Sequence, residues 1–446
     1  MLGFGHGLNV LRGGCAVAAL LAMTSAVTAG GFAVREQSAE FQGMSFAGNA
    51  ASGGGLSGMF WNPAVAAYAP AGIYNESHYS GIFGHVNITG DTTNAAGASF
   101  GLPQSSGNVA KPALVPSSYI SYRLDERWVM ALSINSPFGL ATEPSNRTWA
   151  GQSFGRTVEA KTYNFAPTLA YKLLPSVSIG VGLQIEHMTA RMKFATFATG
   201  PSADQNSIIK GDDTAFGYTA GVNWTPSDHT SIGLGFRSSV NHNLIGTVST
   251  PGSTTTAFQF GGAAVQATTN LPEIVTLSLR HALTDRLTVL ASGEWSNWSR
   301  AEQFNVVCAK NAAPNPVFCP GGNGQLVKSI PLGWHDGWMV ALGGEYKYND
   351  QLKLRTGVAY EVSPIQNAAE RPTFTPDVDR FWASAGATYK WSDKIAFDLG
   401  YSHIFGIGNG DIDRSTGSGL TFQHFIGKVD SSADIVSASM KIKLGD

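Results

Sequence analysis

Apolar and polar residues alternate along most of the chain after residue 70. In residues 177–186, Val, Ile and Leu alternate with Ser, Gly, Gln and Glu, and the same pattern returns in 230–237, 352–361 and 395–402. Successive side chains of a β-strand point to opposite faces, so each segment has one apolar face and one small or polar face. Apolar-outward, polar-inward alternation is typical of a transmembrane β-barrel.

The alternation predicts an all-β, antiparallel barrel of about fourteen strands, an even number as in bacterial single-chain barrels. The strands are expected near residues 71–88, 114–124, 128–136, 154–173, 176–194, 208–224, 229–245, 271–283, 286–304, 329–348, 351–362, 380–391, 394–405 and 434–444. Tight turns rich in Pro, Asp, Asn and Ser then alternate with long connections. The long connections cover 89–113, 137–153, 195–207, 246–270, 305–328, 363–379 and 406–433. This alternation predicts short periplasmic turns, long external loops and periplasmic termini.

Two segments precede the predicted barrel, which spans 71–446. Residues 1–29 are expected to be a signal peptide, because Arg12 precedes a short apolar run and small residues end the segment at Ala29. Residues 30–70 are rich in Gly, Ala and Ser and fit neither a strand nor an external loop. A fourteen-stranded lumen lies between the filled eight-stranded barrel and the open sixteen-stranded porin. We therefore expect residues 30–70 to form a hatch that plugs the lumen.

The composition of the chain excludes further classes of function. Charged residues make up 13% of the chain, against about 25% in a typical soluble domain, and the formal net charge of −2 gives no reason to expect nucleic acid. A glycine-rich motif in 53–58 lacks the strand and helix of a dinucleotide site. No metal-ligand cluster, catalytic motif or cofactor site is recognisable.

Cys308 and Cys319 remain after signal cleavage and are expected to form a disulfide that pins a surface loop.

Residues 31–64 contain a set of small and polar residues in a distinctive order, namely Gly31-Phe32, Glu36, Ser38, Gly43, Ala47-Gly48, Ala50-Ala51 and Asn62-Pro63-Ala64. Through these residues the segment resembles the N-terminal hatch of the FadL family, outer-membrane transporters of long-chain fatty acids and other hydrophobic compounds. The similarity continues through 136–140, 271–273, 295–298 and 376–380, and so covers nearly the whole mature chain. The resemblance implies a fourteen-stranded barrel with a hatch, in agreement with the strand pattern.

The apolar residues of the hatch are out of place in a porin. The expected substrate-binding residues are Phe32, Val34, Phe41, Met44, Phe46, Phe60 and Trp61. From the residues alone, these side chains can line a pocket or can pack the hatch against the wall, and the resemblance favours the pocket for Phe32 and Val34.

The resemblance also implies a gate. The expected gating residues of the hatch are Gly43, Gly48, Asn62, Pro63 and Ala64. Pro137, with Phe138 and Gly139, would form a kink that opens the barrel wall sideways, because proline removes a hydrogen bond from the ladder.

Inward charges and external aromatic residues complete the expected site. The charges are Glu186, Arg237, Arg280, Glu294, Lys353, Arg355, Glu361 and Lys390, and we expect them to pair with one another or with the hatch. An Arg or Lys suits a fatty-acid carboxylate, but the sequence selects no single residue. The resemblance implies a docking groove in the external loops, which contain Phe194, Phe197, Phe258, Phe260 and Val265.

Together these features predict a monomeric, non-enzymatic channel in the outer membrane of a Gram-negative bacterium, surrounded by lipid and lipopolysaccharide. It would take up hydrophobic molecules, most readily long-chain fatty acids, by hatch-gated passive diffusion with lateral exit. The alternatives are a transporter of aromatic hydrocarbons on the same fold, a general porin for polar solutes and an outer-membrane lipolytic enzyme.

Overall fold

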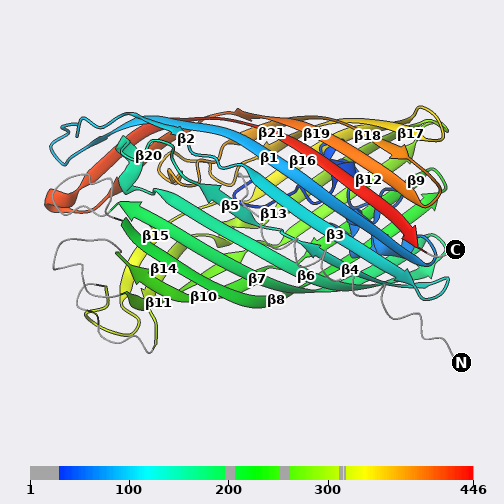
Figure 1. Cartoon of the computed structure of the whole chain (residues 1–446), viewed down its shortest axis with the longest axis horizontal. Coiled ribbons are helices and arrows are strands. Elements are labelled where there is room, and N and C mark those ends of the chain that lie inside the picture. Colours follow the sequence, from blue (N-terminus) through cyan, green and yellow to red (C-terminus); the bar gives the residue numbers. More distant parts are fainter. Residues whose placement is uncertain (1–29, 196–205, 251–261, 311–314, 316–317, 445–446) are drawn as a thin grey trace, which may run out of the picture.

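The computed structural model describes residues 30–195, 206–250, 262–310, 315 and 318–444, and forms a closed antiparallel barrel (Figure 1). The predicted signal peptide, 1–29, lies outside the described residues. The barrel wall consists of β1 (Ile73–Thr93), β3 (Ala113–Arg123), β4 (Trp128–Asn135), β6 (Thr157–Leu174), β7 (Val177–Ala195), β8 (Asn206–Ser227), β9 (Thr230–Arg237), β12 (Ile274–Ala282), β13 (Leu287–Ser296), β16 (Gly337–Lys347), β17 (Leu352–Val362), β18 (Asp379–Lys390), β19 (Ile395–Ile407) and β21 (Gln423–Leu444).

Each wall strand pairs with the next, and β21 closes the barrel onto β1 from the pair Ile73↔Leu444 to the pair Thr93↔His424. The prediction of a fourteen-stranded antiparallel barrel is therefore confirmed. Within the described ranges, no helix is long and apolar enough to cross a membrane.

Further strands extend the wall at the end opposite the C-terminal end of β21 (Figure 1). These are β2 (Ser105–Asn108), β5 (Gly139–Thr142), β10 (Val240–Ser249), β11 (Ala263–Leu271), β14 (Gln303–Cys308), β15 (Leu326–Pro331) and β20 (Asp411–Thr416). Short 3₁₀ turns, η3 (Ala150–Ser153), η5 (Trp298–Arg300) and η6 (Gly419–Thr421), lie between strands. Several stretches predicted as loops thus contain strands, and the last wall strand begins at Gln423 rather than near 434.

The barrel wall has two zones with opposite polarity. On β7, Leu183 is exposed on the outer face and Glu186 is buried on the inner face. Beyond Glu186 the pattern reverses, because Arg191 is exposed outside while Met188 and Met192 are buried inside. The outer zone therefore extends beyond the bilayer, where its outer face meets water. This reversal breaks the simple alternation and explains why the external strand ends were predicted as loops.

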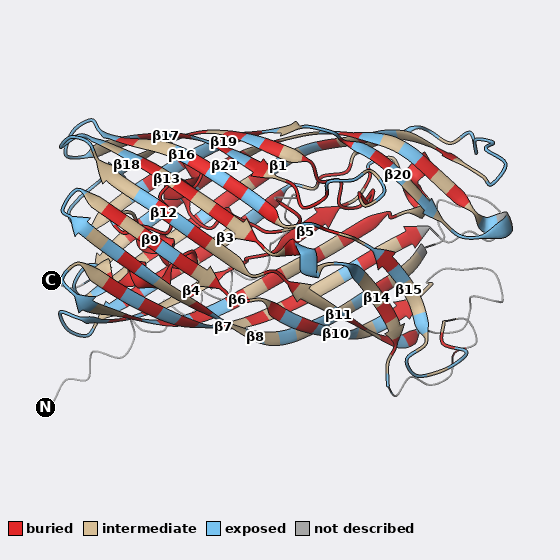
Figure 2. Ribbon diagram, turned by 180° about the vertical axis from the view of Figure 1, so that it is seen from behind, coloured by how far each residue is buried: buried red, intermediate tan, exposed pale blue. Residues whose placement is uncertain are grey.

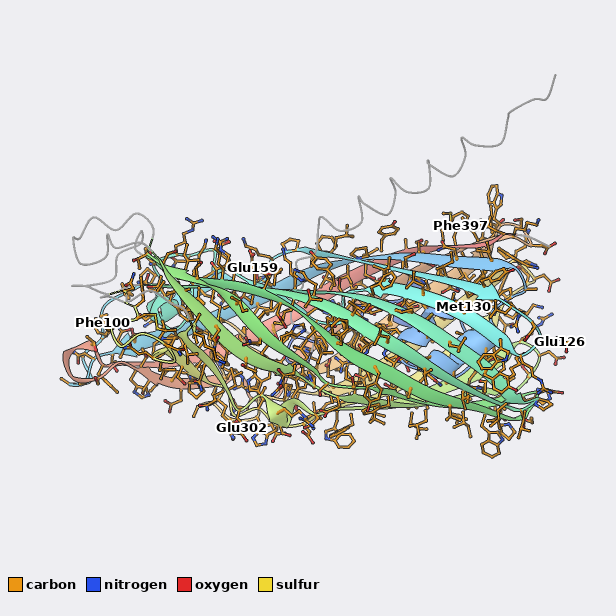
Figure 3. All side chains as sticks on the ribbon, turned by 90° about the horizontal axis from the view of Figure 1, so that it is seen from below. Phe100, Glu126, Met130, Glu159, Glu302 and Phe397 are labelled. Carbon is orange, nitrogen blue, oxygen red and sulfur yellow. A yellow bond between two sulfur atoms is a disulfide. The ribbon has the colours of Figure 1, made fainter. Side chains whose placement is uncertain are left out.

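Apolar side chains cover the outer surface of the membrane zone, and Figure 2 shows the alternation of exposed and buried residues along the strands. Figure 3 shows Met130 and Phe397 on this outer surface, where they are 53% and 39% exposed. The same view places Glu126 in a turn at one end and Phe100 at the other. Hydrocarbon-facing strands require such an apolar surface.

Residues 30–69 fold into a compact hatch inside the lumen, seen as dark blue segments in Figure 1. The hatch contains α2 (Ala39–Gln42), η1 (Leu56–Phe60) and η2 (Pro63–Tyr68), and every residue from 33 to 52 is buried. Glycines on the wall allow the hatch backbone to approach closely, since a side chain at Gly357 would collide with the carbonyl group of Met44. The small residues of the hatch likewise allow its backbone to lie close to the wall.

Candidate functional site

An apolar cavity lies in the outer zone of the barrel, and it is partly open to solvent. Its apolar lining residues are Phe32, Leu140, Val158, Ala160, Met188, Ala190, Met192, Phe304, Ile330, Leu332, Trp334 and Phe374. Most of them occupy inward positions of β5, β6, β7, β14 and β15 above the reversal of polarity. A cavity with this lining suits an apolar ligand, because ligand sites are mostly apolar with few polar groups.

Phe32, from the first residues of the hatch, contributes to the lining of this cavity. Its ring centroid lies 4.8 Å from that of Trp298 and 6.0 Å from those of Phe138 and Trp334. These distances lie within the range of favourable aromatic contacts. The start of the hatch is thus held by the same aromatic cluster that borders the cavity.

The other six predicted binding residues lie within the hatch and its contacts with the wall. They are Val34, Phe41, Met44, Phe46, Phe60 and Trp61, and none of them lines the described part of the apolar cavity. Trp61 is the centre of this cluster, with Phe60 at 4.9 Å and both Phe41 and Phe46 at 5.7 Å between ring centroids. A segment that folds in short turns must bury its own apolar side chains, and these residues do so.

A second, more polar cavity adjoins the first, and Ile330 and Phe374 border both. Lys328 and Arg414 line it, and the Lys328 ammonium lies 4.9 Å from the centre of the Phe194 ring. Burial, together with the nearby charge of Arg414, lowers the pKa of Lys328. This cavity forms a cationic mouth next to the apolar one.

The charges of the mouth are only partly balanced. Arg414 donates hydrogen bonds to the carbonyl oxygens of Ala369, at 2.6 Å, and Pro331, at 3.2 Å. Asp413 also lines the mouth but pairs with His424, with 2.6 Å between Oδ1 and Nε2. Among the described residues, neither Lys328 nor Arg414 forms an ion pair with a carboxylate. An anionic group can therefore bind at the cationic mouth without breaking an ion pair that Lys328 or Arg414 makes among the described residues.

The sequence did not identify most of these residues. The reversal of inward polarity after Glu186 could have identified Met188 and Met192 as lining residues from the sequence. No comparable signal marks Lys328, Phe374 or Arg414, which come together only in the closed barrel. Phe194 was named and lies at the mouth, and Val265 is buried on the inner face of β11, whereas Phe197, Phe258 and Phe260 lie outside the described residues.

Strand pairing in the wall is interrupted between β3 and the strand pair β4–β5, and we call this interruption the window. The ladder of β3 with β4 ends at the pair Ser118↔Ile134, and the next bridge joins Ala110 to Thr142. The chain between β4 and β5 passes through Pro137, whose missing N–H interrupts strand pairing. The predicted opening at Pro137, Phe138 and Gly139 coincides with this window.

The hatch fills the window with its own backbone. Ala33 forms an antiparallel bridge with Phe138, the Val34 N–H donates to the Pro137 carbonyl at 2.8 Å, and the Gly139 N–H donates to the Phe32 carbonyl at 2.8 Å. The hatch therefore pairs with the chain beside the kink through one isolated bridge and its two flanking hydrogen bonds.

Gln37 joins the two sides of the window. Its side-chain amide donates to the Ser136 carbonyl at 2.7 Å. Its own carbonyl accepts hydrogen bonds from the hydroxyls of Ser117, at 2.8 Å, and Tyr119, at 3.0 Å. One hatch residue thus takes the place of ladder bonds that β3 and β4 do not make with each other.

The predicted gating residues anchor the hatch. Asn62 caps η2 by accepting from the Ala64 N–H at 3.0 Å, and Pro63 is the first residue of that turn. The Asn62 side chain also donates to the Val222 carbonyl of β8 at 3.0 Å. The Gly48 N–H donates to the Ser292 hydroxyl at 2.8 Å, and Gly43 packs against Gly386 of β18.

Buried ion pairs also tie the hatch to the wall. Arg35 contacts Glu294 at 2.8 Å and Glu361 at 2.5 Å. Arg355 contacts Glu40 of the hatch at 3.2 Å, and Lys441 pairs with the same carboxylate. The expectation that inward charges pair with one another or with the hatch is confirmed for these groups.

Lys390 departs from that expectation. Its ammonium pairs with Asp393 in the turn after β18, at 2.6 Å, and both side chains are largely exposed. Lys390 lies at the end of β18, where it lines an open pocket together with residues 53–55 of the hatch but pairs with the turn rather than with a hatch residue.

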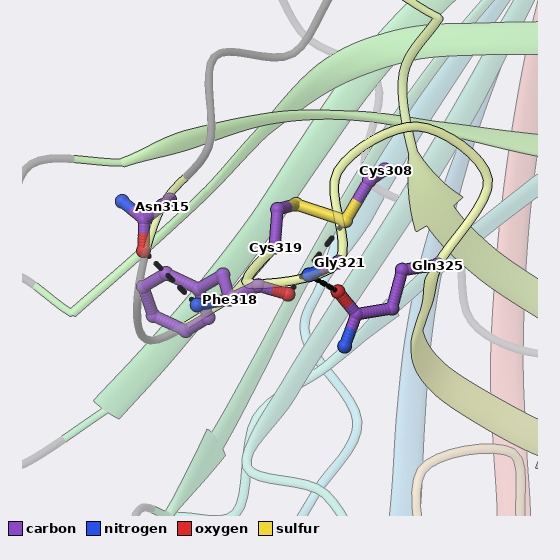
Figure 4. The surroundings of a disulfide bond; sticks show 6 residues. All are labelled: Cys308, Asn315, Phe318, Cys319, Gly321 and Gln325. Atoms are coloured by element: carbon purple, nitrogen blue, oxygen red, sulfur yellow. Dashed lines mark hydrogen bonds between the residues drawn. A yellow bond between two sulfur atoms is a disulfide. The ribbon is translucent and has the colours of Figure 1, made fainter.

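Cys308 and Cys319 form a disulfide at the outer end of β14 (Figure 4). The loop that it closes is held further by the Phe318 N–H, which donates to Asn315 at 3.0 Å, and by the Gly321 N–H, which donates to Gln325 at 2.6 Å. In the described part of the chain, no group of His, Cys, Asp and Glu side chains is arranged to hold a metal ion.

A closed barrel with an apolar outer belt and a lumen filled by its own hatch defines a plugged channel of the outer membrane. Residues 20–444 match the model of the family described as outer membrane protein transport protein (OMPP1/FadL/TodX), and the chain belongs to that family. The chain is therefore an outer-membrane transport protein and not an enzyme.

Related proteins cover most of the chain. The long-chain fatty acid transport protein of Escherichia coli O6:H1 is 28% identical over 433 residues, which is 88% of this chain and 90% of the relative. Outer membrane protein P1 of Haemophilus influenzae is 27% identical over 431 residues, which is 87% and 88% of the two chains.

Solved structures share the fold. A Pseudomonas aeruginosa FadL homologue aligns with a TM-score of 0.80 at 22% identity, over 92% of this chain and 99% of the homologue. The Ralstonia pickettii toluene transporter TbuX aligns with a TM-score of 0.64 at 15% identity, over 92% of this chain and 100% of the neighbour.

Proposed function

We propose that this protein takes up long-chain fatty acids across the outer membrane. The observation that carries the proposal is the apolar cavity beside a mouth lined by Lys328 and Arg414, neither of which forms an ion pair with a carboxylate of the described residues. In this arrangement the acyl chain lies in the cavity and the carboxylate lies at Lys328 and Arg414. Each buried methylene contributes about 0.8 kcal/mol, and a charged donor strengthens a hydrogen bond to a carboxylate. The Escherichia coli relative named for long-chain fatty acid transport supports the same substrate.

The proposed route leads from the mouth, through the apolar cavity, to the window. Residues 32–37 of the hatch would leave their positions beside Pro137 and Ser136, and the ligand would pass between β3 and β4 into the bilayer. The exit of an apolar molecule into lipid avoids its transfer into periplasmic water. The sequence contains no recognisable motif for energy coupling, so movement down the concentration gradient is the simplest driving force.

Two observations favour this function over its alternatives. Toluene has no charge for Lys328 and Arg414 to bind. A general porin for sugars requires an open polar lumen, whereas the hatch fills this lumen and buries residues 33–52.

The test is competition for a fluorescent fatty acid bound to the purified barrel. Oleate should displace the probe at micromolar concentration, while toluene and methyl oleate should compete much more weakly. Uptake of labelled oleate by a strain without its own transporter should depend on expression of the protein. Equal displacement by toluene and oleate would overturn the choice of substrate, and free passage of sugars through liposomes would favour the porin.

A further inference from the structure

Four cationic side chains gather on the outer face of the barrel, in the zone above the apolar belt. They are Lys161 of β6, Arg191 and Lys193 of β7, and Lys210 of β8, and we call them the outer cationic patch. Each of the four is exposed or half-buried. Among the described residues, none of them forms an ion pair with a carboxylate. The patch therefore presents unneutralised positive charge to the surroundings of the barrel.

Strand register places these cations side by side. Arg191 lies directly opposite Lys210 in the ladder of β7 with β8, and Lys193 is diagonal to Lys210. Lys161 is diagonal to Arg191, because Glu159 is the β6 residue opposite Arg191. Opposite side chains have Cβ atoms about 5 Å apart and diagonal ones are about 7–8 Å apart, and like charges directly opposite each other destabilise a sheet. An anion bound between these side chains would remove that repulsion.

The carboxylates on the same face do not balance the patch. Glu159 lies opposite Arg191 and Asp212 lies diagonal to it, so two carboxylates share this face with four cations. The surplus of positive charge is therefore a property of the fold at this place, although the net charge of the whole chain is −2.

A recess at the upper edge of the patch adds to the surplus. Arg147, Arg156 and Lys193 line this recess, and Glu143 is its one carboxylate among the described residues. Glu143 already pairs with Lys111 and lies 3.7 Å from Arg147. The recess thus provides a concave, cationic end to the patch.

The patch lies above the part of the wall that faces hydrocarbon. Ile185 and Phe216 form the last outward apolar pair of β7 and β8 below the patch, and Phe216 is 65% exposed. Six residues separate Ile185 from Arg191, which is about 20 Å along a strand, and the distance along the barrel axis is shorter because the strands tilt by about 40°. Cations at this height meet the polar layer of the outer leaflet and not its acyl chains.

The outer face of β21 is different. Lys428 lies opposite Asp411 of β20, and Asp430 and Asp434 occupy further outward positions of the same strand. Carboxylates outnumber the lysine on this part of the wall. The cationic surplus is therefore local to β6, β7 and β8.

We propose that the outer cationic patch binds phosphate groups of lipopolysaccharide in the outer leaflet. Lipopolysaccharide carries phosphates on the sugars above its acyl chains, so its chains can pack on the apolar belt while its phosphates reach the patch. Arg and Lys form charge-assisted hydrogen bonds to phosphate oxygens, and the planar guanidinium of Arg191 can bind two of them at once. This site lies on the outside of the barrel, so the inference does not depend on which substrate the lumen carries.

The test measures the binding of rough lipopolysaccharide, whose short sugar chain carries phosphates, to the purified barrel in detergent by microscale thermophoresis. Lys210→Gln should weaken binding about fivefold, and the double variant Arg191→Gln with Lys210→Gln should weaken it tenfold or more, since each cation near an anionic lipid surface adds to the attraction. The same lipopolysaccharide after chemical removal of its phosphates should bind the wild-type protein and both variants weakly and alike.

Lys428→Gln is the matched control, because it removes one exposed lysine from the outer wall at a place where a carboxylate lies opposite. It should bind lipopolysaccharide as the wild-type protein does. Circular dichroism and oleate binding should be unchanged in every variant, since the substituted side chains lie outside the lumen. The inference is overturned if the double variant keeps the wild-type affinity, or if dephosphorylated lipopolysaccharide binds the wild-type protein equally well. If phosphatidylglycerol competes as strongly as lipopolysaccharide, the assignment to lipopolysaccharide is wrong.

Discussion

Lys328 is the residue at which charge and apolar surface meet. Its ammonium contacts Phe194, and it lines the mouth beside Arg414. We expect Lys328→Gln to weaken the binding of oleate about tenfold, since a charged hydrogen bond at a half-exposed site is lost. Lys328→Arg should keep most of the affinity. Methyl oleate, which has no charge, should bind all three proteins alike, and calorimetry on the purified barrels measures the difference.

The same lysine gives oleate binding a pH dependence. Burial and the charge of Arg414 lower its pKa, so the ammonium loses its proton at a lower pH than a free lysine, whose pKa is about 10.4. At pH values where oleate is ionised, its affinity should be full below the lowered pKa of Lys328 and should fall as the pH rises through that pKa. Lys328→Arg should remove this fall, because guanidinium stays charged. An identical pH profile in the variant would assign the effect to another group.

At the scale of the element, the proposed route requires the hatch segment beside β5 to move away from the wall. Ala33 and Phe138 face each other between flanking hydrogen bonds, and such non-hydrogen-bonded pairs have Cα atoms about 4.5 Å apart, within the range of a disulfide. The double variant Ala33→Cys with Phe138→Cys should lock the window, so that oleate uptake stops and returns on reduction. Wild-type protein treated with the same reductant is the control. Uptake that persists in the oxidised variant would exclude exit through this window.

Glycines of the wall determine how closely the hatch packs against the barrel. A Cβ at Gly357 on β17 would overlap the backbone of Met44. We expect Gly357→Val to displace the hatch, to lower stability by about 1–3 kcal/mol and to raise conductance in planar bilayers. Gly293→Val is the matched control, because a Cβ there meets no atom within 4 Å. If the two variants conduct equally, the close contact at Gly357 has no role in seating the hatch.

At the scale of the whole molecule, the hatch and the barrel are separable structures. The wall closes through its own ladder from β1 to β21, while the hatch is held by anchors such as Arg35 and Glu40. Deletion of residues 30–70 should therefore leave a folded barrel that admits small polar solutes. Liposome swelling with sugars measures the leak. Unchanged permeability in a folded deletion variant would show that the hatch does not plug the lumen.

The sequence by itself determined the barrel, because lipid on one side and a polar lumen on the other impose a period of two on every strand. It also marked the hatch, since residues 30–70 fit no strand, and the kink, since Pro137 has no N–H for the ladder. The same alternation contains the reversal of inward polarity after Glu186. To recognise that reversal, however, one must know where the bilayer ends.

Only the tertiary structure decided the site. Phe32, Lys328, Phe374 and Arg414 are far apart in the chain, and the closure of the barrel brings them to adjoining cavities. The sequence grouped Phe32 with Trp61 because both are aromatic hatch residues, yet one lines the apolar cavity and the other packs the hatch core. Local pattern fixes which face of a strand a side chain occupies, whereas the contacts across the lumen depend on strand register and on how the hatch folds within it.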